Sequence, residues 1–179
     1  MTLEEAKALL TENGIPFELR EFENEKAYWH HTALFPYTKN ARPCRVMAVI
    51  IRSRNGKKNI ELQFNDDGGN FLFEELRFGN YNFELFEHKE EYIIPDLLEN
   101  IRDIMAGNLM VIDMNDLKKQ RWIGDCCFDR NDEDETFGEG AFRNMVGEIR
   151  KPKGWLSRLL RTKKQYEIYD WNSYECIIK

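Results

Sequence analysis

Apolar side chains near the start of the chain recur at helical spacing. A helix over residues 3–13 is predicted by the positions of Leu3, Ala6, Leu9 and Leu10. Thr2 to Glu5 has the S/T-x-x-E form of a capping box, in which the hydroxyl and the carboxylate satisfy backbone N–H groups at the helix start. Gly14 ends this helix, and we expect a strand over residues 17–22 after it.

The next segment, residues 25–43, shows no regular spacing of apolar positions. It is rich in aromatic residues and ends near Pro43. We therefore expect a long loop that either folds back over the core or presents its aromatic side chains to a partner, since Trp and Tyr are enriched where proteins bind one another. The candidate partner contacts are Tyr28, Trp29, His30, His31, Phe35 and Tyr37.

Residues 44–87 carry the pattern of a β-meander. Three turn signals separate the apolar runs at the intervals of consecutive hairpins: Asn55-Gly56, Asp67-Gly68-Gly69 and Gly79-Asn80. Residues 46–51 are apolar at every position, which is typical of a central strand covered on both faces. Residues 59–65 alternate instead, with Glu61 and Gln63 outward, so we expect that face to meet solvent or a partner.

The second half of the chain predicts further helices and short strands. An amphipathic helix is expected over residues 95–106, because Pro95 suits the first helical turn and apolar positions follow it at helical spacing. Strands are expected over residues 109–114 and 121–128. The remaining expected elements are a helix after the capping-box pattern of Thr136 to Glu139, a short helix at 155–161, and a closing hairpin at 166–178.

Together these elements predict a single α+β domain, residues 1–179. We expect a mostly antiparallel sheet, with the β-meander 44–87, packed by the amphipathic helices 3–13 and 95–106. The 179 residues, 42% hydrophobic and 32% charged, fit one globular core and exclude collagen, coiled coil and disorder. No apolar run approaches the roughly 20 residues of a membrane-spanning helix, and the N-terminus is acidic where a signal peptide is basic. We therefore expect a cytoplasmic protein.

Charge is unevenly placed along a chain whose formal net charge is −6. Residues 150–164 contain no acid, and their basic residues form a candidate basic patch: Arg150, Lys151, Lys153, Arg158, Arg161, Lys163 and Lys164. The apolar residues of this segment are most simply explained by packing on the sheet. The alternative occupants of the patch are an acidic protein surface, an anionic membrane or nucleic acid, although the acidity of the whole chain makes nucleic acid the weaker choice.

Motifs for metal, nucleotide or nucleophilic chemistry are incomplete. His30 and His31 are adjacent, whereas two metal ligands on one helix or strand are spaced i, i+4 or i, i+2, so we expect no metal. Acidic neighbours disfavour the thiolate form of Cys126 and Cys127, so we expect both to be buried structural thiols on a strand. Gly138-Glu139-Gly140 lacks the third glycine of a dinucleotide fingerprint, so we expect no cofactor.

Recognition of another protein is therefore the favoured function. We expect a non-catalytic cytoplasmic protein-binding module with an acidic, aromatic surface, comparable to small acidic toxin-neutralising (immunity-type) or regulatory proteins of bacteria. One alternative is a hydrolase whose site combines His30 or His31 with sheet carboxylates such as Glu61 or Glu84. Another is an adaptor that binds anionic membrane or nucleic acid through residues 150–164.

Overall fold

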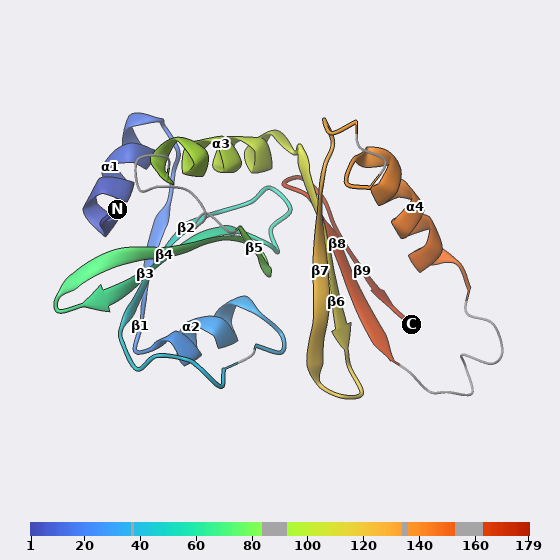
Figure 1. Ribbon diagram of the computed structural model, residues 1–179, viewed down its shortest axis with the longest axis horizontal. Helices are drawn as coiled ribbons and strands as arrows, with labels where there is room; N and C mark the ends of the chain where they lie inside the picture. The colour runs from blue at the N-terminus through green and yellow to red at the C-terminus, as the bar shows by residue number, and fades with distance from the viewer. Residues whose placement is uncertain (37, 84–92, 134–135, 153–162) are drawn as a thin grey trace.

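Two antiparallel sheets stand side by side in the computed structural model, which describes residues 1–36, 38–83, 93–133, 136–152 and 163–179 (Figure 1). Sheet A has the strand order β1-β2-β3-β4-β5, with β1 (Glu18–Phe22), β2 (Val46–Ile51), β3 (Ile60–Asp67), β4 (Asn70–Phe78) and β5 (Tyr81–Phe83). Sheet B has the order β7-β6-β8-β9, with β6 (Leu109–Asp116), β7 (Arg121–Asp129), β8 (Lys164–Tyr169) and β9 (Tyr174–Ile178). The helices of the described residues are α1 (Leu3–Glu12), α2 (Glu25–Thr32), α3 (Ile93–Ala106) and α4 (Glu139–Arg150).

Apolar clusters fill the spaces between these layers. The largest cluster lies between sheet A, the helices α1 and α3 above it, and the inner face of sheet B (Figure 1). Its buried members include Leu10, Leu62, Ile101, Val111 and Tyr169. Further clusters join α4 to the outer face of sheet B and α2 to the opposite face of sheet A. Because the largest cluster draws side chains from both sheets, burial of its apolar surface holds the sheets against each other.

The structure confirms the α+β class, the β-meander as far as β5 and its two flanking helices, whereas residues 84–87 of the predicted meander lie outside the described residues. Strands β2 to β5 pair in sequence order, each antiparallel to the next. Thr2 and Glu5 form the expected capping box at the start of α1. The predicted helix 95–106 is α3, which begins two residues earlier, at Ile93. The later strands form a second sheet, which the hydrophobic pattern did not separate from the first.

The prediction of a loop over residues 25–43 is wrong for its first part, because Glu25–Thr32 form α2. The side chain of Asn24 caps this helix by accepting a hydrogen bond of 2.9 Å from the backbone N–H of Ala27. Within α2 the buried side chains are those of Glu25 and Tyr28. A helix whose buried face contains a carboxylate has no apolar stripe, so the hydrophobic pattern does not reveal it.

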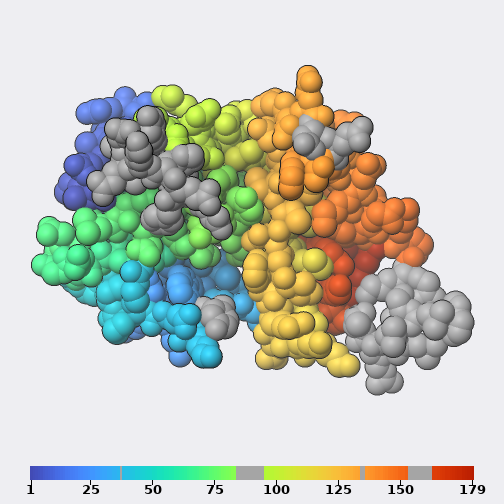
Figure 2. Space-filling view, viewed as in Figure 1, coloured from blue at the N-terminus to red at the C-terminus, as the bar shows by residue number. Residues whose placement is uncertain are grey.

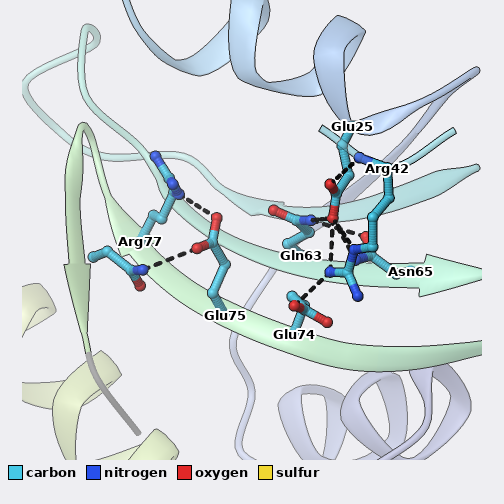
Figure 3. A network of polar contacts seen from close by, with 8 residues as sticks. Glu25, Arg42, Gln63, Asn65, Glu74, Glu75 and Arg77 are labelled. Atoms are coloured by element: carbon cyan, nitrogen blue, oxygen red, sulfur yellow. Dashed lines mark hydrogen bonds and ion pairs between the residues drawn. The ribbon is translucent and has the colours of Figure 1, made fainter. Parts of the chain in front are cut away.

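The outward face of the predicted strand 59–65 does not meet solvent. Glu61 and Gln63, which were predicted to point outward, are buried, 7% and 1% exposed, and so is Asn65, 6% exposed, on the face of β3 that α2 covers. Figure 3 shows the polar network there: the Glu25 carboxylate accepts hydrogen bonds of 2.8 Å from Asn65 Nδ2 and from Arg42 Nε. Burial alone would raise the pKa of Glu25, but the bonds from Arg42 and Asn65 outweigh burial and lower it. This buried polar network therefore attaches α2 to sheet A.

Predictions for the last third of the chain have mixed outcomes. The capping box of Thr136 and Glu139 is wrong, because α4 has Gly138 as its N-cap and that residue makes no side-chain cap bond. Instead, the carbonyl of Phe137 accepts a hydrogen bond of 3.0 Å from the backbone N–H of Asp129, which holds the approach to α4 against the end of β7. The closing hairpin is confirmed as β8 and β9. The expected short helix at 155–161 lies outside the described residues.

Among the residues that the structure describes, no helix has the length and apolar character needed to cross a bilayer.

Candidate functional site

A cleft of about 360 Å³ opens between the two sheets, and we call it the interface cleft. The side chains that line it come from α2 and the segment after it, from the β4–β5 turn and from sheet B, and they include Trp29, Phe35, Asn80, Asn115, Trp122 and Asp125. In Figure 2 the α2 region, in blue tones, and the β6–β7 hairpin, in yellow, lie against each other along this boundary. The volume falls near the lower end of the range, about 300–1,000 Å³, that is usual for ligand-binding clefts.

The wall on the sheet A side depends on α2 and the residues directly after it. The helix ends where the backbone N–H of Ala33 donates a hydrogen bond of 3.0 Å to the carbonyl of Trp29. Extended backbone at Ala33 then leads to Phe35, which lines the cleft together with Trp29. Because the buried Glu25 network attaches the first turn of α2 to sheet A, it also holds these aromatic side chains in place.

Asp113 of β6 organises the wall on the sheet B side. Its Oδ1 accepts a hydrogen bond of 3.0 Å from Trp122 Nε1. Its Oδ2 accepts hydrogen bonds from Asn80 Nδ2 and, at 3.4 Å, from Asn115 Nδ2. Asp113 is completely buried, and these donors offset much of the cost of burying a carboxylate. One carboxylate thereby aligns side chains from the β4–β5 turn, from β6 and from β7.

Two buried oxygens beside Asp113 have no hydrogen-bond donor in the described part of the chain. They are Oδ1 of Asn80 and Oδ1 of Asn115. The amide nitrogens of both residues face Asp113, so their oxygens point away from it. Both residues line the interface cleft and are at least nine-tenths buried. An unpaired buried acceptor costs free energy, so an additional donor would be bound favourably here.

Negative charge remains on the sheet B side of the cleft. Asp125 is the cross-strand partner of Asp113 on β7, and Glu167 is its partner on β8. Lys58 neutralises Glu167 through an ion pair of 2.7 Å. Burial raises the pKa of Asp125 and of Asp113, and for Asp113 the charge of Lys58 and the hydrogen bond from Asn80 oppose this rise.

Arg77 brings a positive charge to the sheet A side of the cleft. Its Nε donates to Oε1 of Glu75, and Asn82 Nδ2 donates to the other carboxylate oxygen of Glu75 at 2.9 Å (Figure 3). The charge of Arg77 is therefore matched by Glu75. After these pairings, the carboxylates of Asp113 and Asp125 set the sign of the electrostatic potential in the cleft.

The predicted aromatic contacts are distributed between the cleft and the core. Trp29 and Phe35 line the interface cleft. Tyr28 is fully buried, and the centroid of its ring lies 5.4 Å from that of Phe22. This side chain therefore packs over the core and offers no surface to a partner. The helical turn explains the difference, because neighbouring residues of α2 point to different sides. Tyr37 lies outside the described residues.

The histidines lie on α2 and both are exposed. Nε2 of His31 lies 3.9 Å from Oε1 of Glu61, which is longer than a hydrogen bond. Burial, together with Arg20, lowers the pKa of His31, whereas burial raises the pKa of Glu61 to about 7. Neither His31 nor Glu61 lines the interface cleft. The hydrolase alternative requires a hydrogen-bonded base and acid facing a cleft, and this pair does not supply them; Glu84 lies outside the described residues.

Part of the predicted basic patch is paired with acids of the same chain. Arg150 Nη2 lies 2.6 Å from Glu175, and Lys151 forms an ion pair with Glu148. Lys163 is exposed and Lys164 is half-buried in β8, whereas Lys153, Arg158 and Arg161 lie outside the described residues. In the described part of the segment, Arg150 is thus paired with an acid of β9 and Lys151 with an acid of α4.

The thiols and carboxylates do not assemble a metal or nucleophile site in the described ranges. All four cysteines are free, and Cys126 is exposed, whereas both thiols of the pair were expected to be buried. Burial raises the pKa of Cys127 to about 12, so this thiol is a poor nucleophile. No group of three or more His, Cys, Asp or Glu residues that could hold a metal ion occurs among the described residues.

Sequence reasoning missed most of the cleft, including Asp113, Trp122 and Asp125. One signal was present: Asp113 interrupts the apolar run of the strand at 109–114. A charged residue inside a buried strand is rare unless it is paired, so its position indicates a polar partner elsewhere in the fold. Asn80, which supplies that partner, was assigned to a turn on its sequence alone.

No protein-family model, no curated protein and no solved structure matches this chain. The function is therefore inferred from the residues of the interface cleft.

Proposed function

We propose that this protein is a non-catalytic protein-binding module that contacts its partner with the rim of the interface cleft. The observation that carries the proposal is the position of the exposed indole of Trp122, 47% exposed, together with Trp29 and Phe35, around an acidic cleft. Tryptophan is the residue most typical of binding hot spots, because it buries a large area at a small entropic cost. The negative charge of Asp113 and Asp125 complements a basic partner.

The narrower class, a small acidic toxin-neutralising or regulatory protein, is consistent with this proposal. A net charge of −6 would accelerate the encounter with a basic partner protein. Such a protein acts by occupying the surface of its partner, which requires no catalytic group of its own. A cleft whose acceptors are already aligned would also limit the entropy lost on binding.

Affinity capture with matched variants tests the proposal. The tagged full-length protein would be used to capture partners from its native host, in parallel with Trp122→Ala, which removes the exposed indole at the cleft. Phe137→Ala is the matched control, because Phe137 is also an exposed aromatic residue, 56% exposed, and does not line the cleft. We expect one captured protein to be lost with Trp122→Ala and kept with Phe137→Ala.

The purified captured protein would then be titrated with each variant by calorimetry. A hot-spot tryptophan predicts a loss of at least 2 kcal/mol of binding free energy for Trp122→Ala, which is roughly a thirtyfold increase in Kd. Equal affinities of the wild type and Trp122→Ala, with both proteins folded by circular dichroism, would refute the assignment of the contact surface to the cleft.

A further inference from the structure

The acceptors of the interface cleft indicate which chemical group the cleft receives, an inference that rests on the proposed function. Three residues that line the cleft carry acceptor groups: Asn80 and Asn115, whose Oδ1 atoms are buried, and Asp125, whose carboxylate is half-buried. The two amide oxygens lack donors, and no other side chain of the described residues donates a hydrogen bond to Asp125. The lining also contains donors: the guanidinium of Arg77, which is paired with Glu75, and Nε1 of Trp29, which is buried and has no acceptor among the described residues. The three acceptors on the sheet B side and at the β4–β5 turn are therefore the groups that a bound donor can satisfy.

The orientation of these acceptors is built into the fold. Asp113 holds the amide nitrogens of Asn80 and Asn115, which prevents either side chain from turning its nitrogen toward the cleft without losing a bond to a buried carboxylate. Asp113 is therefore a positioning residue. A ligand with a single donor would satisfy one acceptor, whereas a group with several donors in fixed directions can satisfy acceptors from both sheets.

The remaining features select among cations. A metal ion is disfavoured, because no group of three or more His, Cys, Asp or Glu side chains in the described ranges could hold one. An ammonium group carries its charge on a compact, strongly hydrated centre. A guanidinium group is planar, presents five N–H donors and stacks on aromatic faces. Trp29, Phe35 and Trp122 supply aromatic surface around the acceptors.

We propose that the interface cleft binds the guanidinium group of an arginine side chain presented by the partner protein, with Asp125 pairing its charge and the amide oxygens of Asn80 and Asn115 accepting its N–H groups. The flanking aromatic residues cover the apolar stem of the arginine. Arg77 lines the same cleft and its charge acts on Asp125, and its ion pair with Glu75 reduces its repulsion of the bound cation.

A nuclear magnetic resonance titration of the full-length protein tests the proposal. The probe is the blocked tripeptide acetyl-Gly-Arg-Gly-amide, and the matched peptides contain citrulline, which is the neutral isostere, or lysine. We expect saturable shifts of the Asn80 and Asn115 side-chain NH₂ signals and of the Trp122 indole N–H. Since a single side chain supplies the contacts, a Kd of about 1 mM is reasonable, with at least tenfold weaker binding of the citrulline and lysine peptides.

One variant of a cleft residue and one control variant test whether these shifts come from the cleft. Asp125→Asn keeps the shape of the side chain and removes its charge, and we expect it to weaken binding of the arginine peptide at least tenfold. Asp67→Asn is the control, because Asp67 is exposed at the end of β3, away from the residues that line the cleft. Equal binding of arginine and citrulline peptides, tighter binding of the lysine peptide, or no shift at these signals would overturn the proposal.

A separate arm identifies the source of the guanidinium group. Free L-arginine that binds more tightly than the blocked peptide would indicate a small-molecule site and overturn the assignment to a protein side chain. The proposed function fails independently, if a captured partner binds Trp122→Ala as well as it binds the wild type. A partner that needs Trp122 while the arginine peptide does not bind would retain the protein-binding function and exclude the arginine.

Discussion

The phenol oxygen of Tyr169 in sheet B accepts a hydrogen bond of 3.2 Å from the backbone N–H of Asn80 in sheet A. The same hydroxyl donates to the carbonyl of Phe78 at 3.1 Å, and the rings of Tyr169 and Phe78 meet edge to face with centroids 5.2 Å apart. Tyr169 is fully buried, so these bonds are shielded from water. They hold the β4–β5 turn against sheet B and bring the Asn80 side chain within reach of Asp113.

This relationship predicts that Gly79→Ala is more destabilising than a glycine substitution in an open turn. A Cβ atom at Gly79 would lie 2.7 Å from the hydroxyl oxygen of Tyr169, and φ is +60°. Gly68 is the control, because its φ is +63° and nothing lies within 4 Å of a Cβ there. Both variants carry backbone strain of about 1–2 kcal/mol, and we expect Gly79→Ala to lose about 1–3 kcal/mol more. Urea unfolding measures the difference; equal losses would contradict the close approach.

Removal of the Glu25 carboxylate is expected to detach α2 from sheet A. Glu25→Ala leaves Asn65 Nδ2 and the backbone N–H of Arg42 without their acceptor. The expected cost is about 1–3 kcal/mol of unfolding free energy for the buried Asn65 amide left without its acceptor, because Arg42 is half-exposed and keeps its ion pair with Glu74. Lys26→Ala, at the adjacent exposed position of α2, is the control and should change stability by less than about 0.5 kcal/mol. The fluorescence of Trp29 reports whether α2 stays docked; an unchanged spectrum and stability would exclude this role.

The pH dependence of stability provides a test of the buried Glu61. Burial raises its pKa from 4.5 to about 7, although Arg77 and neighbouring arginines oppose the shift. The folded state therefore binds this proton more tightly than the unfolded state, and the carboxyl lowers stability progressively as the pH rises from about 4.5 through 7. We expect Glu61→Gln to change little at pH 4 and to stabilise the protein by about 2 kcal/mol at pH 8.

The control for the pH test is Glu12→Gln, which replaces an exposed carboxylate of α1. Its effect on unfolding free energy should be small at both pH values. A gain for Glu61→Gln that is as large at pH 4 as at pH 8 would show that ionisation of Glu61 is not its cause.

Asp113→Ala should destabilise the protein and change the environment of Trp122. The substitution removes the acceptor of Trp122 Nε1 and of two asparagine amide groups. Donors left without an acceptor cost free energy, and removal of a buried carboxylate recovers part of that cost because its charge no longer has to be taken out of water. We therefore expect a loss of about 2–4 kcal/mol of unfolding free energy at pH 7. Urea unfolding and the emission maximum of the tryptophans measure both effects, and Asp67→Ala is the exposed control. A stability equal to that of the wild type would show that Asp113 does not organise this wall.

The sequence by itself determined the elements whose information is local. The capping box of Thr2 and Glu5 identifies the start of α1, and Asn55-Gly56, with Gly56 at a φ of +67°, identifies a turn of the meander. Apolar periodicity then identifies α3 and the central strand β2. These features depend on residues a few positions apart, so the pattern is sufficient to predict them.

The tertiary structure alone decided where the polar residues go. Glu25 is buried because Asn65, 40 positions away, and Arg42 satisfy it, and Asp113 is buried because Asn80, 33 positions away, donates to it. Side chains such as these are expected at the surface unless a distant partner offsets the cost of removing them from water. That offset exists only once the two sheets have packed together, so the helix α2 and the interface cleft could not be read from local spacing.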